Sequence, residues 1–124
     1  MNDLIYKEEA YEIVGICMEV HNELGPGLLE IIYKEAIEWE LDNRFIQYER
    51  EKAYPVYYKK NLLRKKFNAD FVVYDKIILE IKAKEQLCNE DIAQTINYVK
   101  LSGCKLGLLI NFSRSKLEVK RLVY

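Results

Sequence analysis

The stretch that decides the fold is residues 68–82, which read NADFVVYDKIILEIK. Two runs of apolar and β-branched residues flank the polar break Tyr74-Asp75-Lys76, a pattern typical of two strands joined by a tight turn. If the turn consists of these three residues, Val73 pairs with Ile77 in an antiparallel hairpin. The pairing of every other residue in the two strands then follows from this register.

The same register predicts a cluster of three charged residues. Asp70 lies opposite Glu80, and Lys82, two residues further on, projects from the same face as Glu80. Two carboxylates about 5 Å apart on adjacent strands repel each other unless a cation or a shared proton lies between them. Mg²⁺ is a suitable cation, and beside a lysine it can activate water for attack on a phosphoryl group. The alternative is an ion pair between Glu80 and Lys82 on a solvated face.

Two helices are predicted before this hairpin. Apolar residues recur at helical spacing from Leu4 to Leu24, and Gly25-Pro26-Gly27 then breaks the pattern. A second helix follows, with Tyr33 and Ile37 on its apolar face, and Asp42-Asn43 marks its end. Each helix therefore has one apolar face with which to cover a sheet.

The rest of the chain predicts a mixed sheet and one further helix. The expected strands are Ile46–Tyr58, Leu62–Val73, Ile77–Ala83, Leu106–Ile110 and Leu117–Tyr124. Pro55 cannot donate to a ladder, so the first strand is expected to be an edge strand or to be interrupted there. Asn89 is expected to cap the third helix and Gly103 to end it, and the expected buried positions are Ile92, Ala93, Ile96 and Val99. The order ααβββαββ fits an α/β (α+β) fold, with a mixed β-sheet flanked by helices.

Composition limits the classes of protein that fit this sequence. The chain has 124 residues and half of them are hydrophobic, which predicts a single domain over residues 1–124. The net charge of -1 means that any contact with nucleic acid needs a local basic patch. No apolar run is long enough to span a membrane, and the residues after Met1 do not resemble a signal peptide. The three cysteines form no CxxC pair, so reduced cysteines and a cytoplasmic location are expected.

A local basic patch is predicted around the first hairpin turn. Its members are Lys59, Lys60, Arg64, Lys65 and Lys66. Such a cluster can contact a phosphate backbone, and the preceding Tyr54, Tyr57 and Tyr58 can stack on bases. The alternative is a hairpin tip whose lysines only solubilise it and protect a strand edge.

Several segments together resemble a known family. Residues 27–33, GLLEIIY, match the signature GxxExxY, and further matching segments lie along nearly the whole chain. These segments are His21, LGPGLLEIIY at 24–33, NADF at 68–71, EIKAKEQL at 80–87, AQTINYVKLSG at 93–103 and LGLLINF at 106–112. The sequence thus resembles the GxxExxY family of the PD-(D/E)XK nuclease superfamily, and the resemblance implies a restriction-endonuclease-like core.

The resemblance also implies roles for the clustered residues. Asp70 and Glu80 become metal ligands, and Ile81 contributes its backbone carbonyl to the ion. Lys82 becomes the catalytic lysine. Glu30, on the second helix, matches the additional acidic residue that members of the superfamily often bring to the metal or its water. Its place at the core-facing edge of that helix favours this role, because an unpaired charge there is costly.

Other residues receive weaker assignments. Gln94 and Tyr98, four apart on one helical face, look like the QxxxY element of exonuclease-type members; alternatively they only bond to one another or to the backbone. Ala69 replaces the proline of the PD pair, which matters little because Asp70 bears the ligand oxygens. His21 is expected to be a partly buried, hydrogen-bonded residue and not a ligand, and Tyr33 is expected to be a core residue and not a catalytic one.

The function expected from these observations is hydrolysis of phosphodiester bonds in nucleic acid, with Mg²⁺ or Mn²⁺ as cofactor. DNA is favoured over RNA as the partner, and no contact with a membrane is expected. Two alternatives stay open. One is a catalytically inactive module that binds nucleic acid or a protein partner through its basic hairpin. The other is a homodimer or a component of a larger assembly, since so small a domain has little surface for holding a duplex.

Overall fold

The structure, a computed structural model, describes residues 4–124. Its helices are α1 (Lys7–Leu24), α2 (Glu30–Asn43) and α3 (Asn89–Ser102). Its strands are β1 (Tyr48–Tyr54), β2 (Tyr57–Tyr58), β3 (Asn61–Leu62), β4 (Phe67–Val73), β5 (Ile77–Lys82), β6 (Leu106–Asn111) and β7 (Glu118–Val123). The prediction that the chain does not start with a signal peptide depends in part on residues 1–3, which are outside the described range. Within that range, no helix combines the length and the apolar character needed to cross a membrane.

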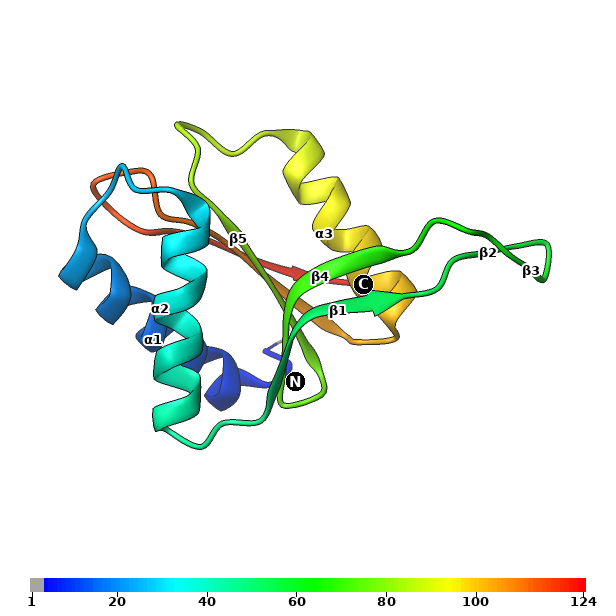
Figure 1. Cartoon of the computed structure of the whole chain (residues 1–124), viewed down its shortest axis with the longest axis horizontal. Helices are drawn as coiled ribbons and strands as arrows, with labels where there is room; N and C mark the ends of the chain where they lie inside the picture. Colours follow the sequence, from blue (N-terminus) through cyan, green and yellow to red (C-terminus); the bar gives the residue numbers. More distant parts are fainter. Residues whose placement is uncertain (1–3) are drawn as a thin grey trace.

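The main sheet is mixed, as predicted. Its strand order is β1-β4-β5-β6-β7, and every neighbouring pair is antiparallel except β5 and β6, which are parallel. A parallel pair needs a crossover connection, and α3 supplies it. In Figure 1, α1 and α2 lie on one side of the sheet and α3 lies on the other. The predicted fold class, a mixed sheet flanked by helices, is confirmed.

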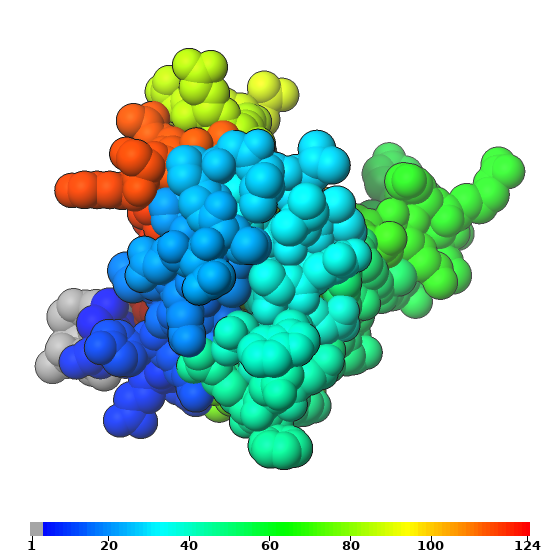
Figure 2. All heavy atoms as spheres, turned by 60° about the vertical axis from the view of Figure 1, so that its left-hand side comes forward, coloured from blue at the N-terminus to red at the C-terminus, as the bar shows by residue number. Residues whose placement is uncertain are grey.

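The first predicted hairpin is divided into two parts. β1 pairs with β4 in the main sheet, whereas β2 and β3 form a separate two-stranded hairpin between them. Pro55 lies directly after β1, which is an edge strand, and it cannot continue the ladder. The predicted order with three strands before α3 is therefore too simple, since five strands occur there. Figures 1 and 2 show the β2–β3 hairpin extending away from the body of the protein.

Two hydrophobic clusters hold the helices on the sheet. The larger one joins α1 and α2 to one face, with Ile13, Ile37 and Phe71 among its fully buried members. The smaller one joins α3 to the other face through Val72, Ile78 and Val99. The cluster under α3 has fewer buried apolar members than the cluster under α1 and α2, so α3 buries less apolar surface against the sheet.

The buried face of α3 differs from the predicted one. Asp91, Thr95 and Val99 are buried, whereas Ile92 and Ile96 are half-buried and Ala93 is exposed. Gly107 of β6 explains this orientation, since a Cβ atom there would lie 2.7 Å from Val99 Cγ2 and 3.0 Å from Thr95 Cγ2. The absence of that Cβ lets α3 approach the sheet along its small and polar side.

Candidate functional site

The turn between β4 and β5 sets the register that the sequence predicted. Val73 pairs with Ile77, and Phe71 pairs with Leu79. Tyr74 and Asp75 both have positive φ, at 58° and 60°, which is the backbone form of the tightest hairpin turns. The next facing pair beyond Phe71 and Leu79 is therefore Asp70 and Glu80.

At Asp70 and Glu80 the regular ladder stops and side chains replace backbone acceptors. The N–H of Asp70 donates to Glu80 Oε2 at 2.8 Å, and the N–H of Ile81 donates to Asp70 Oδ2 at 2.8 Å. Both acidic residues are buried, with 9% of Asp70 and 3% of Glu80 exposed. The strands thus separate around two adjacent carboxylates: Asp70 and Glu80 lie close together as predicted, but side-chain hydrogen bonds and not a ladder pair join them.

The regular alternation of β4 side chains between the two faces of the sheet is interrupted at Asp70. Phe71 belongs to the larger hydrophobic cluster, whereas Ala69, two residues earlier, belongs to the cluster under α3. Regular alternation would place both on one face. On β1, Arg50 pairs with Phe71 and Lys52 pairs with Ala69, so Glu51 lies across from Asp70 without forming a ladder pair. The φ of Glu51, 55°, is unusual for a non-glycine residue.

Lys34 of α2 reaches the carboxylates from the other side. Its Nζ lies 2.8 Å from Asp70 Oδ1, 3.3 Å from Glu30 Oε1 and 3.6 Å from Glu51 Oε2. Burial alone lowers the pKa of Lys34, but Asp70 and Glu30 outweigh that effect and raise it. One ammonium group therefore neutralises acidic residues from α2, β1 and β4. Sequence reasoning missed Lys34 and Glu51; the spacing of four residues between Glu30 and Lys34 was a signal for the first of them.

Glu80 is the most strongly perturbed acid of the cluster. Burial, followed by the neighbouring charge of Asp70, raises its pKa to about 8. Lys82 acts in the opposite direction, because its positive charge favours the ionised form of Glu80. In the described part of the chain, no hydrogen bond or ion pair engages the Lys82 ammonium, so this amine is available to another group.

Backbone geometry also bears on Ile81. In a strand, the N–H and the carbonyl of one residue point toward the same neighbour. Because the Ile81 N–H points to Asp70, its carbonyl lies on the β4 side as well. The predicted backbone ligand is thus on the same side of β5 as the Asp70 carboxylate.

The residues predicted on α3 lie at different depths. Tyr98 is half-buried and stacks on Phe67, with ring centroids 4.5 Å apart. Burial, then the charges of Glu80 and Asp70, raise the pKa of Tyr98, so its hydroxyl is within electrostatic range of both acids. Gln94 lies one turn earlier on the helix and is exposed.

Glu30 is positioned by the loop that precedes α2. Tyr33 is fully buried, its hydroxyl donates to the Gly25 carbonyl at 2.6 Å, and it accepts from the Leu28 N–H at 3.1 Å. Tyr33 thus anchors the loop from which α2 starts, and Glu30 is the first residue of that helix. Glu30 reaches Asp70 only through their shared contact with Lys34.

The sequence of this chain matches a known protein family. The profile of the PD-(D/E)XK nuclease superfamily matches residues 7–122. The chain belongs to this superfamily. A solved structure called "Crystal structure of SSO0001" is similar in fold, with a TM-score of 0.56 at 19% sequence identity, and the match covers 95% of this chain and 57% of that one. The chain thus spans little more than half of that protein's length, and among curated proteins none matches it.

Nucleases of the PD-(D/E)XK superfamily generally use divalent metals, and the residues present fit such an ion in their chemistry. Asp70, Glu80 and the Ile81 carbonyl offer only oxygen donors, which Mg²⁺ and Mn²⁺ prefer, and Mg²⁺ is commonly held by one or two carboxylates. Within residues 4–124, no group of three or more His, Cys, Asp or Glu side chains forms a ready-made ion site. Two carboxylates and a backbone oxygen therefore make up the candidate donor set.

The segment between β5 and α3 is fixed close to this PD-(D/E)XK donor set. Buried Asn111 accepts from the Lys84 N–H at 3.0 Å and donates to the Lys84 carbonyl at 2.8 Å. Asp91 accepts from the Lys84 ammonium at 2.8 Å and from the Cys88 N–H at 2.9 Å. Cys88, and not the predicted Asn89, is the N-cap of α3. These bonds anchor the backbone directly after β5, two residues beyond Lys82.

The five predicted basic residues are exposed on or just after the projecting hairpin, away from the two buried acids. They are Lys59, Lys60, Arg64, Lys65 and Lys66. Lys59 and Lys60 form the hairpin turn with φ of 47° and 69°, and Tyr57 and Tyr58 beside them are exposed. Nucleases of this superfamily act on nucleic acid. The hairpin, which connects β1 to the Asp70 strand β4, carries positive charge and aromatic rings of the kind that contact nucleic acid.

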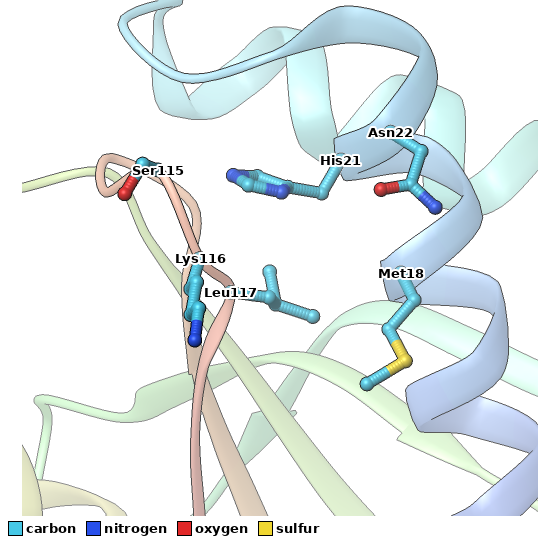
Figure 3. A pocket seen from close by; sticks show the side chains of 6 residues that line it. All are labelled: Met18, His21, Asn22, Ser115, Lys116 and Leu117. Carbon is cyan, nitrogen blue, oxygen red and sulfur yellow. The ribbon is translucent and has the colours of Figure 1, made fainter.

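A separate hollow lies between α1 and the loop after β6. Figure 3 shows its lining residues, which are Met18, His21, Asn22, Ser115, Lys116 and Leu117. His21 is buried and its Nε2 lies 2.8 Å from the Arg114 carbonyl oxygen, so it fills the structural role that the sequence predicted. None of the predicted metal ligands lines this hollow, and it is distinct from the PD-(D/E)XK cluster.

Proposed function

We propose that this chain is a divalent-metal-dependent nuclease that hydrolyses phosphodiester bonds, with Mg²⁺ or Mn²⁺ as cofactor and DNA as its preferred substrate. The observation that carries the proposal is the pair of buried, adjacent carboxylates of Asp70 and Glu80. Two such groups are stable together only with a proton or a cation beside them. Membership of the nuclease superfamily supports a metal cation as that partner.

The proposal gives each residue a role. Asp70, Glu80 and the Ile81 carbonyl would hold the ion. Glu30 would bind a water molecule on that ion. When bound, a divalent cation supplies Lewis-acid polarisation of a phosphoryl oxygen. Lys82, whose ammonium is not engaged by another described side chain, orients the attacking water and neutralises developing negative charge.

The remaining candidate residues hold the substrate. Tyr98 borders the acidic pair, and with Gln94 on the same helix it contacts the nucleotide next to the reacting phosphate. Lys59, Lys60, Arg64, Lys65 and Lys66 contact phosphates further along the strand. We also infer that the chain belongs to the GxxExxY group, since Tyr33 and Glu30 of that signature have separate tasks here, one in the loop and one at the acidic cluster.

The test compares the wild-type protein with Asp70→Asn and with Asp75→Asn as a matched control. Asp75 lies in the β4–β5 turn and its side chain is 68% exposed, so the same isosteric change there leaves the site intact. Labelled single-stranded DNA, duplex DNA and RNA are incubated with Mg²⁺, Mn²⁺ or EDTA. We expect metal-dependent cleavage by the wild type and by Asp75→Asn, and none by Asp70→Asn. Cleavage that survives in Asp70→Asn would show that Asp70 does not hold the catalytic ion.

The exposed hairpin favours one second candidate, a non-catalytic module that binds nucleic acid or a protein partner, alone, as a homodimer or within a larger assembly. Its support is the charge and aromatic exposure of the projecting hairpin, which do not depend on Asp70. Binding of nucleic acid without cleavage in any metal, together with no detectable Mn²⁺ binding, would select this candidate.

A further inference from the structure

The ammonium of Lys34 lies beside the Asp70 carboxylate, where a bound metal ion would also lie. Its side chain is 12% exposed, and its ammonium lies within 4 Å of carboxylates on three different elements. The shortest of the three contacts, 2.8 Å, is to Asp70, whose side chain is 13% exposed. Glu30 and Glu51 are more accessible, with 42% and 50% of their side chains exposed. The lysine therefore makes its closest contact with the acid that solvent reaches least.

Both oxygens of Asp70 already have a partner. Oδ2 accepts the Ile81 N–H and Oδ1 contacts Lys34. A Mg²⁺ ion lies about 2.0–2.1 Å from a carboxylate oxygen. An ion on Oδ1 would thus be less than about 5 Å from an ammonium that stays at its present distance, and the two positive groups would repel strongly in a site with little water.

We propose that Lys34 is an internal counterion, which occupies Asp70 in the metal-free protein and moves toward Glu30 and Glu51 when a divalent cation binds. The inference rests on the proposed function, because it takes Asp70 as a metal ligand. Lysine suits this role, since its ammonium is a point charge on a flexible four-carbon chain. Glu51 suits it too, because its carboxylate lies 3.6 Å from the Lys34 ammonium and belongs to β1, the strand next to Asp70.

The inference has a measurable consequence for metal affinity. Metal binding in the wild type must displace the lysine, so removal of its charge should strengthen binding. We expect Lys34→Met to bind Mn²⁺ about tenfold more tightly than the wild type, and Lys34→Arg to bind no more tightly than the wild type. Lys76→Met is the matched control, because it removes the same charge from a different ion pair, the 3.0 Å contact with Glu9.

The experiment is titration of each full-length protein with Mn²⁺ by calorimetry, with Asp70→Asn to identify the site. Thermal unfolding with and without Mn²⁺ gives a second readout. Metal-free Lys34→Met has lost the cation beside its acids, so its melting temperature should be lower and its increase with Mn²⁺ should be larger than in the wild type. Should methionine prevent folding, Lys34→Gln provides the same loss of charge with a polar side chain.

A double-mutant cycle tests the part played by Glu51. If Glu51 acts by receiving the lysine, Glu51→Gln weakens Mn²⁺ binding in the wild type and has little effect in the Lys34→Met background. Equal weakening in both backgrounds contradicts that role, since it means that Glu51 attracts the ion directly.

The outcomes separate this inference from the proposed function. Mn²⁺ binding that depends on Asp70 but is not tighter in Lys34→Met overturns the displacement of Lys34 and leaves the metal site standing. Absence of Mn²⁺ binding in every variant overturns both. Binding in Lys34→Met but not in the wild type supports the displacement in its strongest form.

Discussion

The backbone N–H of Asp70 donates a 2.8 Å hydrogen bond to the carboxylate of Glu80. In a regular sheet a strand N–H donates to a backbone carbonyl, whereas here the acceptor is a side chain of β5. The bond holds Glu80 beside a second acid at a buried position, and it makes the ionisation of Glu80 part of the strand pairing. The stability of the metal-free protein should therefore depend on the protonation of one side chain.

The first prediction concerns pH. Burial and Asp70 raise the pKa of Glu80 from 4.5 to about 8, so between these values the folded state binds more protons than the unfolded state. The free energy of unfolding of the metal-free protein should then fall as the pH rises through this range, by roughly 1–3 kcal/mol. Urea unfolding in EDTA at pH 5.5, 7 and 8.5 measures the change. Glu80→Gln, which cannot ionise, should remove most of it; the same pH slope in this variant would assign the effect to another group.

The second prediction separates the catalytic amine from the metal ligands. Lys82→Ala should retain Mn²⁺ binding, because the ammonium is not a ligand, while cleavage falls by about 100-fold or more. Calorimetry gives the affinity and a single-turnover assay gives the rate. Lys82→Arg, which keeps the positive charge, should recover part of the activity. A fall in metal affinity as large as the fall in rate would assign Lys82 to holding the site together.

The third prediction concerns the hairpin. Lys65→Ala with Lys66→Ala should weaken binding to duplex DNA and reduce the slope of log affinity against log salt by about one for each phosphate that the protein no longer neutralises. Fluorescence anisotropy in EDTA, at several salt concentrations, measures both quantities without cleavage. The control pair is Lys116→Ala with Lys120→Ala, which removes two exposed lysines outside the hairpin. Equal effects in the two pairs would show that only total charge matters.

The fourth prediction compares two glycines. Gly107→Ala places a methyl group 2.7 Å from Val99 Cγ2, so α3 must move and the free energy of unfolding should fall by about 1–3 kcal/mol. Gly15 lies in α1, where a Cβ atom added to it would meet nothing within 4 Å, so Gly15→Ala should stabilise the protein by roughly 0.5–1 kcal/mol. Chemical denaturation of both variants measures the difference. A neutral effect at Gly107 would mean that α3 adjusts without cost.

Much of the acidic pair could be predicted from sequence because local rules determine it. The turn at Tyr74-Asp75-Lys76 sets one register, and continuing that register past Phe71 and Leu79 brings Asp70 and Glu80 close together. The position of Tyr33 as a buried residue also followed from helical spacing. These features depend on residues close together in the chain. For such residues, the spacing of apolar side chains and the residue types in the turn are sufficient to predict the structure.

The residues that were missed depend on contacts between distant segments. Glu51 approaches Lys34 because β1 is distorted opposite Asp70, and no local pattern indicates a positive φ at that glutamate. The buried face of α3 was predicted from apolar residues, but Gly107, twelve residues after Thr95, decides which side of the helix approaches the sheet. Tertiary packing outweighs apolar periodicity there.

The turn that joins β4 to β5 has a consequence for how this chain can vary. Substitutions at Tyr74 or Asp75 change local backbone preference, but an insertion or deletion of one residue would shift one strand against the other and exchange its inward and outward positions. The two acids would then no longer lie beside each other, although each would remain in the chain. The spacing of ten residues between Asp70 and Glu80 is therefore a stricter requirement for this site than the identity of the residues that fill the turn.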